Sequence, residues 1–190
     1  MSTAGRPGTI RIGGASGYWG DSDMALPQFL KEGDLDYIVF DYLAEITMSI
    51  MARARAKDPA QGYATDFVSL LKPHLRAIAD QRVKILSNAG GVNPRACGQA
   101  VQALVKAAGL DLKVAVVEGD DLLARAASFG AVREMFSGES FPPLEKLASI
   151  NAYLGAFPIA NALERGADPG GLQRLSLAEL AYNEALRKRE

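Results

Sequence analysis

The residues best suited to chemistry stand in polar turns, each following a short apolar run. The turns are rich in glycine, asparagine and carboxylates, which can bind a small molecule through main-chain amides or exchange protons with it. If the turns meet in space, they predict one shared small-molecule site. The candidate catalytic residues are Asp41, Glu45 and Glu118, and the candidate binding residues are Gly13, Gly14, Ser16, Gly17, Asn88, Gly90, Gly91, Asn93, Asp120, Asp121 and Asn151.

The first turn, residues 13–22, holds four glycines within its first eight residues. Glycine permits positive φ and lets a ligand approach main-chain N–H groups closely. A helix starting at Asp21 or Ser22 would also point its positive end at an anion. The order GGxSG lacks the spacing of a dinucleotide fingerprint. The turn therefore predicts either an anion or carboxylate site, or a tight turn that needs glycine for its own geometry.

The turn at residues 88–94 leaves a similar choice. Asn93 followed by Pro94 is typical of a helix N-cap and first helical position, and this favours a capping role for Asn93 over a ligand contact. The adjacent Gly90 and Gly91 have no such need, and they indicate that something passes close to the backbone.

The carboxylates form two groups. Asp41 and Glu45 are spaced i, i+4 at a helix start, where one could act as an acid or base, or both could complement the helix dipole. Glu118, Asp120 and Asp121 follow an apolar run and could attract a hard cation, but they lack further ligands at fixed spacing. We therefore predict no metal, and the sequence identifies no cofactor.

Catalytic sets that are built on histidine or cysteine are excluded, because the chain has only one residue of each type. His74 lies in a polar–apolar helix away from every turn, and Cys97 lies on an apolar helix face and is predicted to be a small core residue. Neither a catalytic triad nor a zinc site can be assembled. A lone cysteine forms no intramolecular disulfide, and this is typical of the cytoplasm.

The elements that position these turns are short strands and amphipathic helices. The strands are nearly continuous in apolar residues, which is typical of a parallel sheet buried on both faces. The pattern predicts an α/β fold, a mostly parallel, Rossmann-like layered sheet with flanking helices, whose strand ends meet at one edge. Strands are predicted at 9–13, 35–41, 83–87 and 112–118, and helices at 44–56, 67–81, 96–108, 122–128, 144–154, 158–165 and 175–189.

Composition narrows the function classes. The chain has 190 residues, 48% of them hydrophobic, with 21 Lys and Arg against 22 Asp and Glu. A near-neutral chain without a basic stripe argues against nucleic-acid binding, and no apolar run is long enough to cross a membrane. We expect a cytoplasmic protein.

Several long motifs are specific enough to indicate a family. In order they are IRIGGASGYWGDS (10–22), LDYIVFDYLAEITMSI (35–50), GYATDF (62–67), SNAGGVNPRAC (87–97), VAVVEGDDLL (114–123), NAYLGAFPIANAL (151–163) and GAD (166–168). With these motifs the chain resembles the N-terminal domain of the acyclic terpene utilisation (AtuA-like) family. The resemblance implies a role in catabolism of acyclic terpenes such as citronellol and geraniol, beside enzymes of acyl-CoA carboxylation and oxidation.

The resemblance also divides the chain. We expect a flexible leader at 1–8, an AtuA-like α/β domain at 9–168 and a divergent C-terminal helix at 169–190. Similar proteins continue after GAD with further strands, so the chain resembles an incomplete version of a larger domain. Exposed sheet edges would then favour association with another copy or with a partner chain.

The sequence leaves the reaction open. The leading hypothesis is a catabolic protein that binds or transforms an acyl-CoA or branched carboxylic acid at the carboxyl edge of the sheet, with glycine-rich turns holding an anionic group. The alternatives are a non-catalytic accessory subunit and an inactive truncated family member.

Overall fold

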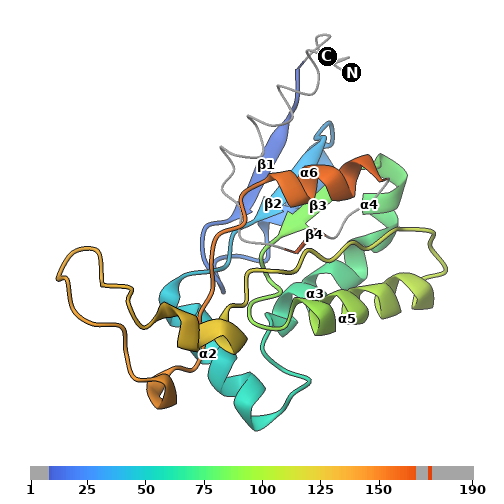
Figure 1. Cartoon of the computed structure of the whole chain (residues 1–190). Helices are drawn as coiled ribbons and strands as arrows, with labels where there is room; N and C mark the ends of the chain where they lie inside the picture. The colour runs from blue at the N-terminus through green and yellow to red at the C-terminus, as the bar shows by residue number, and fades with distance from the viewer. Residues whose placement is uncertain (1–8, 166–170, 173–190) are drawn as a thin grey trace.

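A parallel sheet forms the centre of the molecule. The computed structural model describes residues 9–165 and 171–172 (Figure 1). The sheet order is β1-β2-β3-β4 and every pair is parallel. The strands are β1 (Ile12–Ser16), β2 (Tyr37–Phe40), β3 (Lys84–Ser87) and the two-residue β4 (Gly171–Leu172). The predicted α/β class with a parallel sheet and flanking helices is confirmed.

The sheet is buried on both faces. All four residues of β2 are buried. Ile38 and Phe40 belong to the larger core, while Tyr37 and Val39 belong to a smaller core on the opposite face. Side chains alternate across a strand, so a strand covered on both sides needs apolar residues at every position. That requirement explains why YIVF could be recognised as a buried parallel strand.

Most helices cover one face of the sheet. Residues of the first five helices join the larger core, whereas α6 packs with the smaller core (Figure 1). Short 3₁₀ turns η1 (Lys72–His74), η2 (Leu123–Phe129) and η3 (Leu144–Lys146) complete the connections. The helices are α1 (Ala25–Glu32), α2 (Glu45–Lys57), α3 (Thr65–Leu71), α4 (Leu75–Gln81), α5 (Pro94–Ala107) and α6 (Phe157–Glu164).

The predicted fourth strand at 112–118 is wrong. The edge of β3 pairs with β4, at Leu86 with Gly171 and at Ser87 with Leu172. The valine-rich segment forms no strand and has a β-bridge only at Val116; Val114 contacts the larger core and Val117 belongs to the smaller one. An apolar run whose side chains pack into two cores has the same composition as a buried strand, so the sequence does not distinguish them.

Some element boundaries also differ from the prediction. β1 runs from Ile12 to Ser16, so Gly13 and Gly14 lie within the strand and not in the turn after it. A Cβ on Gly13 would lie 2.8 Å from Leu35 Cδ1, so this glycine permits close packing over the strand. The following helix begins at Ala25 and not at Asp21 or Ser22. The predicted helix at 144–154 is reduced to η3, and that at 122–128 is the 3₁₀ turn η2.

Two further predictions, the leader at 1–8 and the helix at 175–189, lie outside the described residues. Within the described part of the chain, none of the helices has the length and apolar character needed to cross a membrane.

A close approach between segments is found at Gly91, between β3 and α5. Gly91 has φ +53°, and a Cβ there would lie 2.1 Å from Met51 Sδ and 2.7 Å from the Gly62 carbonyl oxygen. The paired glycines predicted that something passes close to the backbone. At Gly91 that neighbour is another part of the same chain, Met51 and the Gly62 carbonyl. This contact fixes α2 and the loop before α3 against the β3–α5 turn.

We predict that Gly91→Ala lowers the free energy of unfolding by about 2–5 kcal/mol, because it combines a steric clash with a strained φ. Gly109→Ala is the matched control, since Gly109 has φ +62° but nothing within 4 Å of the position that a Cβ would take. It should cost only about 1 kcal/mol in urea unfolding. Equal losses in the two variants would contradict the close approach.

Candidate functional site

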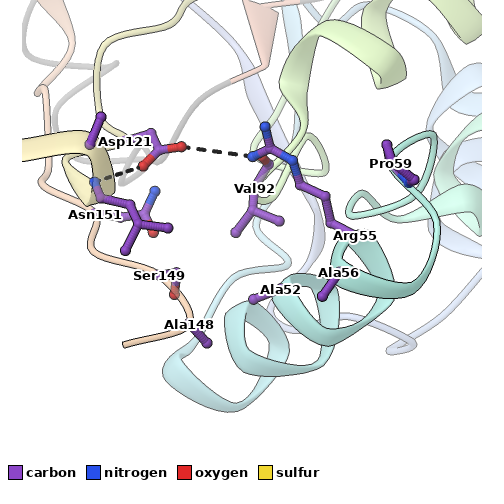
Figure 2. A pocket seen from close by; sticks show the side chains of 11 residues that line it. Ala52, Arg55, Ala56, Pro59, Val92, Asp121, Ala148, Ser149 and Asn151 are labelled. Atoms are coloured by element: carbon purple, nitrogen blue, oxygen red, sulfur yellow. Dashed lines mark hydrogen bonds and ion pairs between the residues drawn. The ribbon is translucent and has the colours of Figure 1, made fainter. Parts of the chain in front are cut away.

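A cleft of about 580 Å³ opens between α2 and the segment 121–151. Figure 2 shows Arg55 and Asp121 facing each other across it, with Ala52 and Ala56 of α2 on one side and Ala148 and Ser149 on the other. Most of its lining is apolar. The apolar members are Ala52, Ala56, Pro59, Val92, Leu123, Ala124 and Ala148, and the polar members are Arg55, Asp121, Ser149 and Asn151. We call this cleft the apolar chamber.

A second hollow of about 280 Å³, the polar chamber, adjoins the first. The two share four lining residues, so they lie side by side. The shared residues are Arg55, Val92, Asp121 and Asn151, and the polar chamber adds Gly91, Asn93, Pro94, Arg95, Glu118, Gly119 and Asp120. Six of the sequence-predicted site residues therefore lie together here: Gly91, Asn93, Glu118, Asp120, Asp121 and Asn151.

Arg55 connects the walls of the site. It stands in the last turn of α2, where a cation complements the helix dipole. Its Nη1 donates a hydrogen bond to the Val92 carbonyl oxygen and lies 3.7 Å from Asp121 Oδ2. Its side chain is 46% exposed, so the ion pair with Asp121 is screened by water. Both contacts involve Nη1, and a guanidinium has further N–H groups that a ligand can use.

The opposite wall is held by short antiparallel backbone pairing. Leu122 N–H donates to the Ile150 carbonyl at 2.8 Å, and Ala152 N–H donates to the Asp120 carbonyl at 2.9 Å. This pairing sets Asp121 opposite Asn151, and Asn151 Nδ2 then donates to Asp120 Oδ2 at 2.9 Å. Residues thirty apart in sequence thus present adjacent side chains to the site.

Glu118, a predicted acid or base, is paired with a cation. Arg95 Nη2 lies 2.6 Å from Glu118 Oε2, and this hydrogen bond raises the pKa of Arg95. Both side chains are largely exposed, so the pair contributes little to stability. At the rim of the polar chamber, the charges of Arg95 and Glu118 therefore cancel each other.

Asn93 has a structural role that accounts for its polar atoms. Its Oδ1 accepts a hydrogen bond from Ala96 N–H at 3.4 Å and caps α5, as predicted. Its Nδ2 donates to the carbonyl oxygens of Pro59 and Gln61 at 2.9 and 2.8 Å. Asn93 therefore shapes the chamber wall by joining α5 to the loop after α2.

A second polar group lies where the strands of the sheet end. Asn88 Nδ2 donates to Asp41 Oδ1 at 2.6 Å, and Asn88 Oδ1 accepts from Tyr42 N–H at 2.7 Å. Asp41 N–H donates to the Ser16 carbonyl at 3.3 Å. Ser16 Oγ is buried and has no hydrogen-bond partner among the described residues. Ser16, Asp41 and Asn88 therefore meet at the carboxyl edge of β1, β2 and β3, as parallel strands require.

The surroundings of the first turn favour a structural role over anion binding. The Gly17 N–H donates to Asp21 Oδ2 at 2.9 Å, so the chain supplies its own carboxylate. The adjacent hollow of about 330 Å³ is lined by three carboxylates and no cation. Burial there raises the pKa of Tyr42, and Asp66 and Asp21 add to the effect. Trp19 Nε1 donates to Asp66 at 2.7 Å and completes this turn.

Glu45, Gly14 and Gly90 are among the predicted residues that line neither chamber. Glu45 is exposed in the first turn of α2, where its charge complements the helix dipole. Gly14 pairs with Val39 inside the sheet.

Two arginines of the polar chamber, Arg55 and Arg95, were not predicted from the sequence. Arg55 sits within ARARAK, whose basic residues have the pattern of a solvated helix end, and no local signal distinguishes it from its neighbours.

Neither a metal cluster nor a reactive thiol is found in the described part of the chain. No group of three or more His, Cys, Asp or Glu side chains there could hold a metal ion. Cys97 is fully buried in the larger core, and burial raises the pKa of its thiol to about 12. The thiolate needed for nucleophilic attack is therefore scarce at neutral pH.

We predict that the Cys97 thiol of the folded protein reacts with a chromogenic disulfide reagent at pH 8 roughly a hundredfold more slowly than in denaturant, because thiolate and access are both lacking. Absorbance stopped-flow with and without guanidinium checks this. Equal rates in the two conditions would exclude a buried thiol.

We predict that Asn88→Asp lowers the free energy of unfolding by about 2–4 kcal/mol at pH 7, because it removes the donor to Asp41 and sets two carboxylates in contact. The loss should shrink as the pH falls toward 4, since one shared proton relieves the repulsion. Asn161→Asp, at an exposed position of α6, is the control and should stay within about 0.5 kcal/mol of the parent. A loss at Asn88 that does not depend on pH would contradict the contact with Asp41.

Comparison with known proteins gives one family. The sequence profile described as "Acyclic terpene utilisation family protein AtuA" matches residues 10–168. No curated protein and no solved structure gives a significant match. The match covers most of the chain and includes both chambers and the strand-end group. The chain therefore belongs to the acyclic terpene utilisation (AtuA) family.

Proposed function

We propose that this protein binds a branched acyl compound, as a CoA ester or the related acid, in the two-chambered cleft beside the β3–α5 turn. The observation that carries the proposal is that an apolar chamber and a polar one lie side by side and share Arg55, Asp121 and Asn151. An amphiphilic molecule with a hydrocarbon chain and one polar end matches that division. Such molecules are what a family of acyclic terpene utilisation would handle.

The apolar chamber suits a branched hydrocarbon chain. Its walls are built from small aliphatic side chains, of which Ala52, Ala56 and Ala148 are examples. Small side chains leave width for methyl branches, and burial of apolar surface favours binding by roughly 25 cal/mol per Å² before the cost of association is subtracted. The volume of about 580 Å³ is also within the usual range for small-molecule sites.

The polar chamber suits the carbonyl end. Arg55 and Asn151 can donate hydrogen bonds to a carbonyl oxygen, and Glu118, Asp120 and Asp121 are the carboxylates of this chamber that could move a proton. These groups come from α2, the segment after residue 117 and the segment before α6. Because three separate segments supply them, binding would hold these segments together.

A second function, a non-catalytic binding or accessory subunit, is favoured by a specific observation. Each carboxylate of the polar chamber already has a partner within the chain: Arg95 for Glu118, Asn151 for Asp120 and Arg55 for Asp121. A general base works best when it is poised to accept a proton from the substrate. Binding without turnover of any acyl-CoA would support this second function.

We predict that Ala56→Trp abolishes binding of branched acyl-CoA esters, because an indole on the exposed cleft side of α2 fills the apolar chamber. The probe is isovaleryl-CoA together with a ten-carbon branched acyl-CoA, read out as melting temperature. A ligand at one hundred times its Kd stabilises the parent by about 2.7 kcal/mol.

Ala103→Trp is the matched control, since Ala103 is an exposed alanine of α5 that lines neither chamber. It should keep the full thermal shift. An unchanged shift in Ala56→Trp would place the acyl site elsewhere.

A further inference from the structure

We propose that the cleft prefers a neutral polar group, such as a thioester or ester carbonyl, over a free carboxylate, and that Asp121 determines this preference. The inference rests on the proposed function and names the chemical state of the ligand. Three observations carry it: the charge of the polar chamber, the pairing of its cations and the partly occupied N-terminus of α5.

The first observation is the charge that lines the polar chamber. Two cations, Arg55 and Arg95, face three carboxylates there, so the lining is negative by one charge. A bound carboxylate would add a second negative charge within the same hollow. Like charges placed together disfavour binding, and this is a common basis of discrimination between ligands. A thioester or ester carbonyl adds no charge.

The second observation is that both cations are already engaged. Arg95 Nη2 lies 2.6 Å from Glu118 Oε2, and Arg55 Nη1 lies 3.7 Å from Asp121 Oδ2. An incoming carboxylate must compete with Asp121 for Arg55. A neutral carbonyl oxygen needs only one donor, and the guanidinium has N–H groups besides those on Nη1. Asp121 therefore leaves Arg55 as a donor while cancelling its charge.

The third observation is that two of the first three amides of α5, those of Ala96 and Cys97, are engaged within the chain where the helix borders the chamber. A helix N-terminus attracts anions through its free N–H groups and its dipole. Here Pro94 has no N–H, and the Ala96 N–H is taken by Asn93 Oδ1. The next amide, of Cys97, donates to the Asn93 carbonyl at 3.2 Å. The neighbouring carboxylates Glu118 and Asp120 supply the negative charge that this end of the helix favours.

The test compares two small probes that share the same acyl group. One is the N-acetylcysteamine thioester of isovaleric acid, which is neutral, and the other is isovalerate. Neither carries the phosphates of CoA; the probes differ in the charge at the acyl end and in the neutral N-acetylcysteamine arm, and the effect of charge is identified by how Asp121→Asn and salt change the ratio of their affinities. Calorimetric titration at pH 7 should give a Kd for the thioester several-fold lower than that for isovalerate.

Asp121→Asn should raise the affinity for isovalerate by up to about fivefold, as expected for a half-exposed ion pair, and change that for the thioester less than twofold. The amide oxygen can still accept the Leu123 N–H that Asp121 Oδ1 accepts at 3.0 Å. Asp111→Asn makes the same charge change at an exposed position outside both chambers and should alter neither Kd.

A second measurement needs no variant. Raising the salt concentration screens exposed charges, so isovalerate should bind the parent protein more tightly at high salt relative to the thioester. The inference is overturned if isovalerate binds as tightly as the thioester, or if neither Asp121→Asn nor salt changes their ratio. If neither probe nor any branched acyl-CoA binds, the proposed function fails and this inference fails with it.

Discussion

The close packing of α2 against the β3–α5 turn is the constraint on which the rest of the structure depends. Gly91 leaves no room for a side chain between Met51 and the Gly62 carbonyl. Around it, Val92 N–H donates to that same carbonyl at 3.0 Å, and Asn93 reaches the loop after α2. Because this contact places Arg55 beside the Val92 carbonyl, it also builds one wall of the cleft. Core packing and the candidate site therefore share one contact.

The carboxyl edge of the sheet and the cleft have different roles. At the edge, Ser16, Asp41 and Asn88 bond to each other and to the backbone, which fixes the turns after the strands. The cleft lies beside the turn that Asn88 begins, and its polar groups come from the end of α2 and from the irregular segments around Asp121 and Asn151 (Figure 2). A rigid edge that positions more irregular segments is a common way to build a binding site.

The fold was largely predictable because its strands have a strong physical signature. All of β2 and the middle of β3, Ile85 and Leu86, are apolar, since both faces of the sheet are covered there. The same signature misled at 112–118, where apolar side chains pack into two cores and a single bridge at Val116 takes the place of a strand. Within the site, Glu118, Asp120 and Asp121 were predictable as carboxylates after an apolar run. Arg55 was not, because its role depends on a tertiary contact with Val92 and Asp121 that leaves no local pattern. The anion site expected at the first turn depended on a free Gly17 amide, which Asp21 occupies.

The central claim is that a branched acyl group occupies the cleft beside α2. The most direct measurement is a titration of ¹⁵N-labelled protein with the isovaleryl thioester, followed by the amide chemical shifts. The account predicts saturable shift changes at Ala52, Ala56, Val92 and the Asn151 side-chain amide, with little change at Gly17 and Gly20. Changes confined to residues 17–22, or none at saturating ligand, would contradict it.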